Sequence, residues 1–284
     1  MRPVLNGNGC GGETVKKFSV EILGSGTSVG VPSIGCDCAV CLSPDPLNKR
    51  LRSSVLIRSF DDAGRNDTTV VVDTTPDFRT QMLRANVRHI DAVMITHYHA
   101  DHVVGIDDVR RFNHMQQRVI DCWANPATLA DIRKSFGYVL VEGDNLRFGL
   151  PCLKAREVIT GERFQIGALE FLPVEMDHRV MKTTGLVITS RGSKPLAYCL
   201  DVKTMNETTL QALEGSHTLI LDMLREKVHP THMNYDEAMG VVARIKPERT
   251  YFGHIAHEVE HRSFEARLPE NIRLAYDGLI IDMA

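Results

Sequence analysis

The sequence has no long hydrophobic run, no excess of charge of either sign and few aromatic residues. No stretch approaches 18 consecutive apolar residues, so we expect no membrane span. Lys and Arg (33) nearly balance Asp and Glu (36), and the formal net charge of −3 gives no bulk attraction for nucleic acid or anionic membranes. The first 17 residues lack the apolar core of a secretory signal and are expected to form a flexible tail.

Cysteine is distributed too irregularly for a disulfide framework. The chain has seven cysteines, an odd number, and three of them fall within six residues: Cys36, Cys38 and Cys41. Such a cluster indicates a metal site in a reducing compartment, so we expect a cytoplasmic protein. The surrounding segment, 30–53, has three prolines and few periodic apolar positions, which predicts a long ordered loop held by something other than a hydrophobic core.

No linker or short repeat divides the remainder of the chain, 18–284. Strands are expected at 18–23, 54–59, 69–73, 92–96, 163–166, 169–174, 185–189, 196–200, 218–222 and 250–252. Helices are expected at 77–86, 106–116, 126–136, 203–213, 234–245 and 257–268. Interleaved strands and helices of this kind predict one α/β domain, with two sheets packed between outer helices.

Histidine is concentrated in short segments, and the densest directly follows the expected strand 92–96. His97, His99, Asp101 and His102 form an H-x-H-x-D-H pattern there, whose chance occurrence is on the order of one in a thousand. Imidazole and carboxylate together suit Zn, Mn or Fe rather than Mg or Ca. Alternate residues of a loop leaving a strand can point to one side, so His97 and His99 can face one ion while Asp101 and His102 face a second.

Four residues are too few for a two-metal site, so further ligands are expected at other strand ends. His178, Asp201 and His254 each lie just after an expected strand, where a sandwich presents its loops along one edge. A single histidine after a strand is more often an ordinary surface residue. Combined with the dense motif, however, the three residues predict a dinuclear metal site.

These residues together resemble the metallo-β-lactamase superfamily, whose members are αββα four-layer sandwich hydrolases with two metal ions. The resemblance extends from about residue 18 to 282. It implies an attacking hydroxide that bridges two ions, Zn or Mn. It also implies a division of ligands: His97, His99 and His178 for one ion, Asp101, His102 and His254 for the other, and Asp201 as the bridging carboxylate.

Within the superfamily, the sequence is similar to the PhnP-type cyclic phosphodiesterases. The similarity is carried by GSGTS at 24–28, GCDCAVC at 35–41, DTTPDFR at 73–79, GIDDVR at 105–110 and LDMLR at 221–225. It implies a structural zinc held by Cys36, Cys38, Cys41 and His257. A closed Cys₃His site would staple the loop 30–53 to the domain. The cysteine spacing alone is also compatible with free thiols.

The segment HMNYDEA at 232–238 resembles the stretch of these enzymes, and of transfer-RNA 3′-processing nucleases, that holds an additional histidine. The resemblance implies that His232 donates a proton at the scissile phosphate, while Asp101 accepts from the hydroxide. Asp73 either orients a metal ligand or caps a turn. Four cations could bind the phosphate, although each is also typical of an ordinary surface position: Arg110, Arg179, Lys182 and Arg225.

These features favour a phosphodiesterase for a small phosphorylated or cyclic phosphate ester. A transfer-RNA 3′-processing endonuclease is disfavoured by the negative net charge and by the lack of an obvious basic, glycine-rich arm within 110–165. A glyoxalase II-like thioesterase is disfavoured by the cysteine cluster and by His232. A silent metal-binding protein would have no need of seven intact ligands. The expected partner is a small substrate rather than a membrane, and a homodimer is the commonest assembly.

Overall fold

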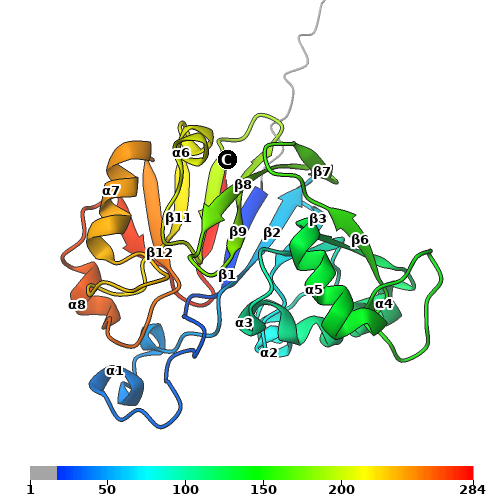
Figure 1. Cartoon of the computed structure of the whole chain (residues 1–284), viewed down its shortest axis with the longest axis horizontal. Helices are drawn as coiled ribbons and strands as arrows, with labels where there is room; N and C mark the ends of the chain where they lie inside the picture. Colours follow the sequence, from blue (N-terminus) through cyan, green and yellow to red (C-terminus); the bar gives the residue numbers. More distant parts are fainter. Residues whose placement is uncertain (1–17, 284) are drawn as a thin grey trace, which may run out of the picture.

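A computed structural model describes residues 18–283, and the expected N-terminal tail, 1–17, lies outside the described residues. Within 18–283, the strands form two seven-stranded sheets that face each other (Figure 1). The first sheet has the order β14 (Ile280–Met283), β1 (Phe18–Gly24), β2 (Ser54–Phe60), β3 (Asn66–Val72), β4 (Ala92–Ile95), β5 (Ile120–Ala124) and β6 (Leu153–Glu157). The second has the order β13 (Ile272–Leu274), β12 (Arg249–Gly253), β11 (Thr218–Asp222), β10 (Leu196–Cys199), β9 (Lys182–Ser190), β8 (Leu169–Asp177) and β7 (Phe164–Ile166).

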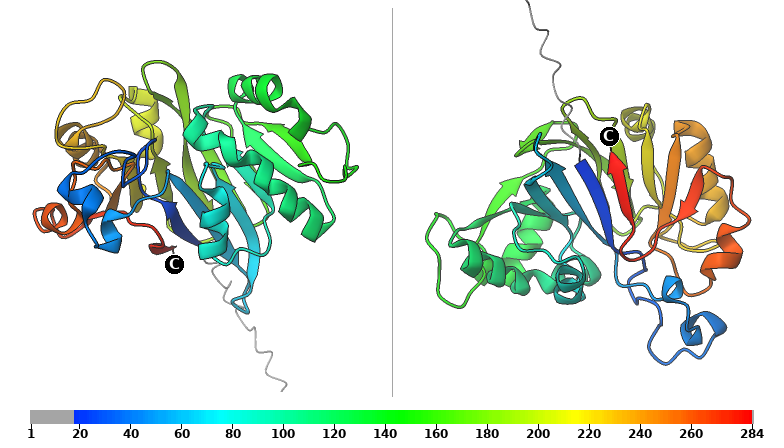
Figure 2. Two further views of the ribbon diagram at one scale, coloured as in Figure 1. Left: turned by 90° about the horizontal axis from the view of Figure 1, so that it is seen from below. Right: turned by 180° about the vertical axis from the view of Figure 1, so that it is seen from behind.

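Helices cover the outer faces of both sheets (Figures 1 and 2). The first sheet is covered by α2 (Phe78–Arg84), α3 (Ala100–Val103), η2 (Val104–Val109), α4 (Arg110–Gln116), α5 (Pro126–Phe136) and η3 (Gly137–Val139). The second is covered by α6 (Glu207–Leu213), α7 (Tyr235–Ile245) and α8 (His261–Glu265). The remaining short helices are α1 (Ala39–Leu42) and η1 (Pro46–Asn48), on the projecting loop at the lower left of Figure 1. No helix among the described residues is long and apolar enough to cross a bilayer.

Strand β3 shows why the sheets are buried on both faces. Val70 and Val72 pack in the core between the sheets, whereas Val71 packs against the outer helices. Successive side chains of a strand point to opposite faces, so an unbroken apolar run suits a sheet covered on both sides. The predicted αββα four-layer sandwich is therefore confirmed.

Parallel pairing collects several strand ends at one edge of the sandwich. In the first sheet β3, β4 and β5 run parallel, and in the second sheet β10, β11 and β12 do so. The carboxyl ends of parallel strands lie at the same edge of their sheet. The two sheets meet near this edge through a hydrogen bond from Thr184 N to Thr96 O.

Several expected helices were wrong in their extent. The helix expected at 203–213 begins only at Glu207, because Asn206 caps it and accepts from Thr209 N. The helix expected at 257–268 is reduced to α8, which leaves His257 in a loop. The helix expected at 106–116 is divided between η2 and α4. Four strands were not expected: β5, β6, β13 and β14, each of five residues or fewer and so too short to show a clear period.

Candidate active site

Three residues at the shared edge have left-handed backbone conformations, although none is glycine. The φ angles are 69° at Asp73, 56° at Asp201 and 58° at His254, each directly after or within two residues of a strand end. Such conformations cost about 1–3 kcal/mol each and persist mainly where the surrounding structure enforces them, often at functional sites. The strained positions therefore mark this edge as the candidate site.

The structure brings all seven candidate metal ligands into one cluster. Their ligand atoms form overlapping groups in which all atoms lie within 4.8 Å of one another: His97, His99 and His178; His97, His102 and Asp201; and Asp101, Asp201 and His254. Asp201 is central, because its Oδ2 atom lies 3.3 Å from both His102 Nε2 and His254 Nδ1. Its Oδ1 atom lies 4.0 Å from His97 Nε2. A carboxylate with one oxygen toward each group can bridge two ions.

The donors of this cluster fit divalent ions. His102 Nε2 and Asp201 Oδ2 are buried and make no hydrogen bond, although buried polar atoms are almost always paired. An ion between them would satisfy both atoms. Imidazole and carboxylate donors suit Zn or Mn, so the residues present are compatible with the metals that the sequence predicts.

The electrostatics of the cluster also favour bound cations. Burial lowers the pKa of His254 to about 3 and that of His97 well below its usual value, so both rings are neutral and ready to ligate. Burial also opposes a charge on His102, but Asp201, Asp73 and Asp101 outweigh it and raise the pKa of the ring. A cation shared by these carboxylates would replace the proton that they otherwise hold on His102.

Outer partners hold the ligand rings in orientation. Asp73 Oδ2 lies 2.7 Å from His102 Nδ1, while Thr96 N and Thr96 Oγ1 donate to the same carboxylate. Asp73 therefore orients a candidate ligand, which is one of the two roles that the sequence left open. His178 Nδ1 lies 2.8 Å from the carbonyl oxygen of Thr231. Contacts of this kind fix the ring nitrogen that faces a metal.

His232 faces the same cluster from the loop before α7. Its ring centroid lies 4.6 Å from that of His178 and 4.5 Å from that of His254. His232 Nδ1 lies 2.8 Å from Asp222 Oδ2. Burial opposes a charge on His232, but Asp222 outweighs burial and raises the pKa of the ring. Burial in turn raises the pKa of Asp222 to about 6.

Asp222 and Lys203 are contributors that the sequence reasoning assigned no role. Asp222 ends strand β11 just as Asp73 and Asp201 follow strands β3 and β10, so the strand-end pattern could have identified it. Lys203 is buried, and its Nζ atom donates to the carbonyl oxygen of His232 at 3.2 Å and to Glu237 at 2.6 Å. Nothing in the local sequence distinguishes this lysine from a surface lysine.

The four candidate phosphate-binding cations do not form one group. Three of them are ion-paired: Arg110 with Asp107, Lys182 with Asp177 and Arg225 with Glu258. Arg110 lines a cavity of about 740 Å³ whose walls, within residues 18–283, include none of the seven candidate ligands. Arg179 is exposed in the loop that directly follows His178, and its backbone N donates to Asp177 Oδ1 at 2.7 Å.

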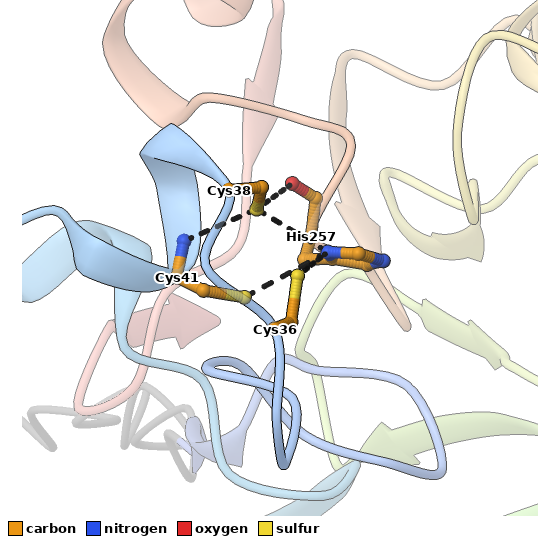
Figure 3. A group of neighbouring side chains, drawn as sticks. All are labelled: Cys36, Cys38, Cys41 and His257. Atoms are coloured by element: carbon orange, nitrogen blue, oxygen red, sulfur yellow. Dashed lines mark hydrogen bonds between the residues drawn. The ribbon is translucent and has the colours of Figure 1, made fainter.

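A second cluster joins Cys36, Cys38 and Cys41 of the projecting loop to His257 in the segment between β12 and α8 (Figure 3). The three sulfur atoms lie 3.3, 3.4 and 3.7 Å from His257 Nδ1. The backbone N–H of Cys41 and the ring of His257 lower the pKa of Cys38 to about 6, which favours the thiolate that metals bind. Three thiols and one imidazole nitrogen match a closed tetrahedral zinc site.

The loop is also held by Arg50, whose side chain is 1% exposed. Its guanidinium donates to the carbonyl oxygens of Ala256 and Val259, on either side of His257. The glycine positions at 24–28 serve close packing, because a Cβ on Gly24 would lie 1.9 Å from Arg52 O. Arg50, the close packing at the glycines and the Cys–His cluster thus add to the small apolar cluster of Val31, Val40 and Cys41 in holding this segment.

We predict that Cys38→Ser removes one equivalent of zinc and lowers Tm. The cluster has few apolar contacts to compensate for the lost metal, and each kcal/mol lost from a domain of this size lowers Tm by about 2–4 °C. Metal analysis and calorimetry of the purified protein measure both effects. The matched control is Cys152→Ser, a cysteine outside the cluster, which should leave the zinc content unchanged. Equal zinc in the wild type and Cys38→Ser would exclude a structural zinc here.

Comparison with known proteins places this architecture in a family. A sequence profile described as the Beta-lactamase superfamily domain matches residues 68–255. The crystal structure of a new diphosphatase from the PhnP family superposes with a TM-score of 0.82 at 36% identity, covering 94% of this chain and 97% of that one. Zn²⁺-bound PqqB from Methylobacterium extorquens gives a TM-score of 0.72 at 21% identity, covering 93% and 99%, and supports the fold alone.

One curated relative is named for a transferase activity rather than for hydrolysis. Octanoyltransferase of Porphyromonas gingivalis (strain ATCC BAA-308 / W83) is 35% identical over 265 residues, which make up 92% of this chain and 51% of that protein. The chain therefore spans about half the length of this relative.

Proposed function

The chain belongs to the metallo-β-lactamase superfamily of hydrolases and is similar to its PhnP family, and from this premise we propose that it is a phosphodiesterase. The proposed substrate is a small phosphorylated or cyclic phosphate ester. Two divalent ions held by the seven-residue cluster would be required, with the Cys₃His zinc as a structural element.

The observation that carries the proposal is the Asp222–His232 pair beside the candidate metal ligands. Phosphate esters of ordinary alcohols have a strongly basic leaving oxygen, which leaves readily only when it is protonated. Asp222 favours the protonated form of His232, and the ring lies against both His178 and His254. A protonated imidazole in this position suits an alkoxide leaving group. A thiolate leaving group is far less basic and needs no such donor, which disfavours a thioesterase.

Other residues would orient the reactants. When bound, the two ions would ionise a water molecule and neutralise charge on the phosphate oxygens. Burial opposes the charged form of Asp101, but His102 outweighs burial and holds the pKa of this carboxyl below its usual range. Asp101 therefore stays ionised, so that it can ligate an ion and accept a hydrogen bond from the nucleophile. Lys203 fixes the backbone of His232, and Asp73 fixes His102. We assign the phosphate contact to Arg179, which is exposed and directly follows His178 in the chain.

Diphosphate hydrolysis is the second candidate, favoured by the solved diphosphatase of the PhnP family at 36% identity. Octanoyl transfer is the activity named for a relative about twice as long as the matched region, and that activity can reside in the half that this chain does not match. The negative net charge continues to disfavour a transfer-RNA substrate.

The test is a panel assay with the metal-loaded protein. It includes bis-p-nitrophenyl phosphate, nucleoside 2′,3′-cyclic phosphates, ribose cyclic phosphate, a dinucleoside diphosphate, precursor transfer RNA, lactoylglutathione and an octanoyl-transfer assay. We expect turnover of the small phosphodiesters. Turnover of the thioester or octanoyl donor alone would overturn the proposal, and turnover of the diphosphate alone would support the second candidate.

A further inference from the structure

A cavity of about 530 Å³ lies beside the candidate active site. One wall includes Tyr98, which stands between two candidate ligands in the chain, His97 and His99. The lining also includes Met181, whose carbonyl oxygen accepts from His178 N, and Thr183, whose hydroxyl donates to Asp201 O at 2.9 Å. Three lining residues therefore border candidate ligands in the chain or through hydrogen bonds, although none of the seven ligands itself lines the cavity within residues 18–283.

The cavity lies where the two sheets meet at the edge that carries the active site. The hydrogen bond from Thr184 N to Thr96 O joins β9, whose Thr184 lines the cavity, to the residue after β4. Asn125 Nδ2 donates to Thr184 Oγ1 at 3.2 Å, which ties the start of α5 to β9. The walls near the metal cluster are thus braced by hydrogen bonds. The outer wall is the loop after β6, including Ile159, which is 44% exposed.

The lining combines apolar surface with hydroxyl and carboxylate groups. The apolar part comes from Tyr98, Pro126, Val158, Ile159 and Met181. Threonine hydroxyls and the carboxylates of Asp131 and Glu175 supply hydrogen-bond partners. Such a mixture suits a ring system that carries hydroxyl groups, because the ring packs on the apolar wall and the hydroxyls donate to the carboxylates.

The charges of the lining do not suit a second phosphate. Lys182 lines the cavity, and its Nζ atom lies 3.0 Å from Asp177 and 3.5 Å from Glu175. Among the described residues no arginine lines this cavity, and Asp131 adds a further negative charge. An additional phosphate group would meet two carboxylates and an ammonium group that is already neutralised, which is repulsive.

We propose that this cavity binds the uncharged alcohol portion of the substrate, a nucleoside or a similar hydroxyl-bearing ring without a further phosphate. The inference deepens the proposed function, on which it rests for the phosphate at the metal cluster. It selects, among phosphodiesters, those whose only charged group is the scissile phosphate.

The first test separates the cavity from the metal site by binding. Titration calorimetry of the metal-loaded protein compares adenosine 3′-monophosphate with inorganic phosphate, and we expect the nucleotide to bind more tightly by about tenfold or more. In Ile159→Trp the larger indole ring should occupy part of the cavity. This variant should abolish the difference in affinity while leaving phosphate binding unchanged. Leu146→Trp is the matched control and should change neither affinity. Leu146 is an exposed leucine that lines the 740 Å³ cavity described above. Equal affinities in the wild type, or an unaffected Ile159→Trp variant, would overturn the proposal.

The second test examines charge. We expect adenosine 2′,3′-cyclic phosphate to be hydrolysed with a catalytic efficiency, kcat/KM, about tenfold higher than that for its 5′-phosphorylated form. Asp131→Asn should reduce the difference in kcat/KM between the two substrates, because it removes one carboxylate that repels the 5′-phosphate. A preference for the 5′-phosphorylated form would overturn the proposal. If neither diester is hydrolysed, the proposed function fails, whereas the calorimetric comparison still decides whether the cavity takes the nucleoside.

Discussion

Replacing His232 by glutamine is expected to lower kcat by about 10²–10⁴-fold on a diester with an alkoxide leaving group. Glutamine is similar in size but cannot deliver a proton at any pH. The loss should be far smaller on bis-p-nitrophenyl phosphate, because p-nitrophenolate leaves without protonation. Steady-state kinetics on the two substrates, with metal content measured in parallel, provide the comparison.

His229→Gln is the matched control. The ring centroid of His229 lies only 5.2 Å from that of His232. The Nδ1 atom of His229, however, lies 3.3 Å from the hydroxyl of Thr231 rather than beside Asp222. It should leave both substrates largely unaffected. Equal losses on both substrates with His232→Gln would show that the residue binds the phosphate rather than protonating the leaving group. A changed metal content would show instead that His232 is a ligand, as its grouping with His178 and Asp201 would allow.

Asp222→Asn provides a pH-dependent check of the same assignment. Asp222 raises the pKa of His232, so the proton-donating form is present below that pKa and is lost as the pH rises through it. Asparagine preserves an acceptor for Val202 N but removes the charge that favours the imidazolium. In a plot of kcat against pH, the decrease on the alkaline side should therefore move to lower pH. A decrease at unchanged or higher pH would contradict the role of His232 as the acid.

Replacing Asp201 by asparagine is expected to abolish the metal pair and nearly all activity. The loss of an outer partner of a metal ligand typically costs about 10–100-fold, and loss of the carboxylate central to both groups should cost more. Its two oxygens lie 3.3 to 4.0 Å from His97, His102 and His254. Metal analysis by mass spectrometry and kinetics over a range of added Zn or Mn measure both effects.

Asp177→Asn is the matched control, because Asp177 also ends a strand, β8, yet pairs with Lys182 instead of joining the cluster. This variant should retain two active-site ions and most of its activity. Full metal content and activity in Asp201→Asn would remove the basis for a bridged pair.

The sandwich could be predicted from the sequence because its signals are local. The run at Val70–Val72 already indicates a strand buried on both faces, and Asn234 with Glu237 already forms the capping pair of α7. Elements whose limits depend on distant contacts were predicted less well. His257 lies before α8, which Glu260 caps, and its ring meets three cysteines more than 200 residues away, a contact that no local pattern shows.

The sequence by itself determined the ligand types, since a dense His–Asp motif and three residues at strand ends suffice to indicate two cations. Only the tertiary structure decided how these residues face one another and what stands behind them. Lys203 and the 530 Å³ cavity have no local signature, because their properties arise from elements that pack together from remote positions. Residue types and short-range motifs can be read from the sequence. Burial, charge compensation and cavity shape exist only after the two sheets have packed against each other.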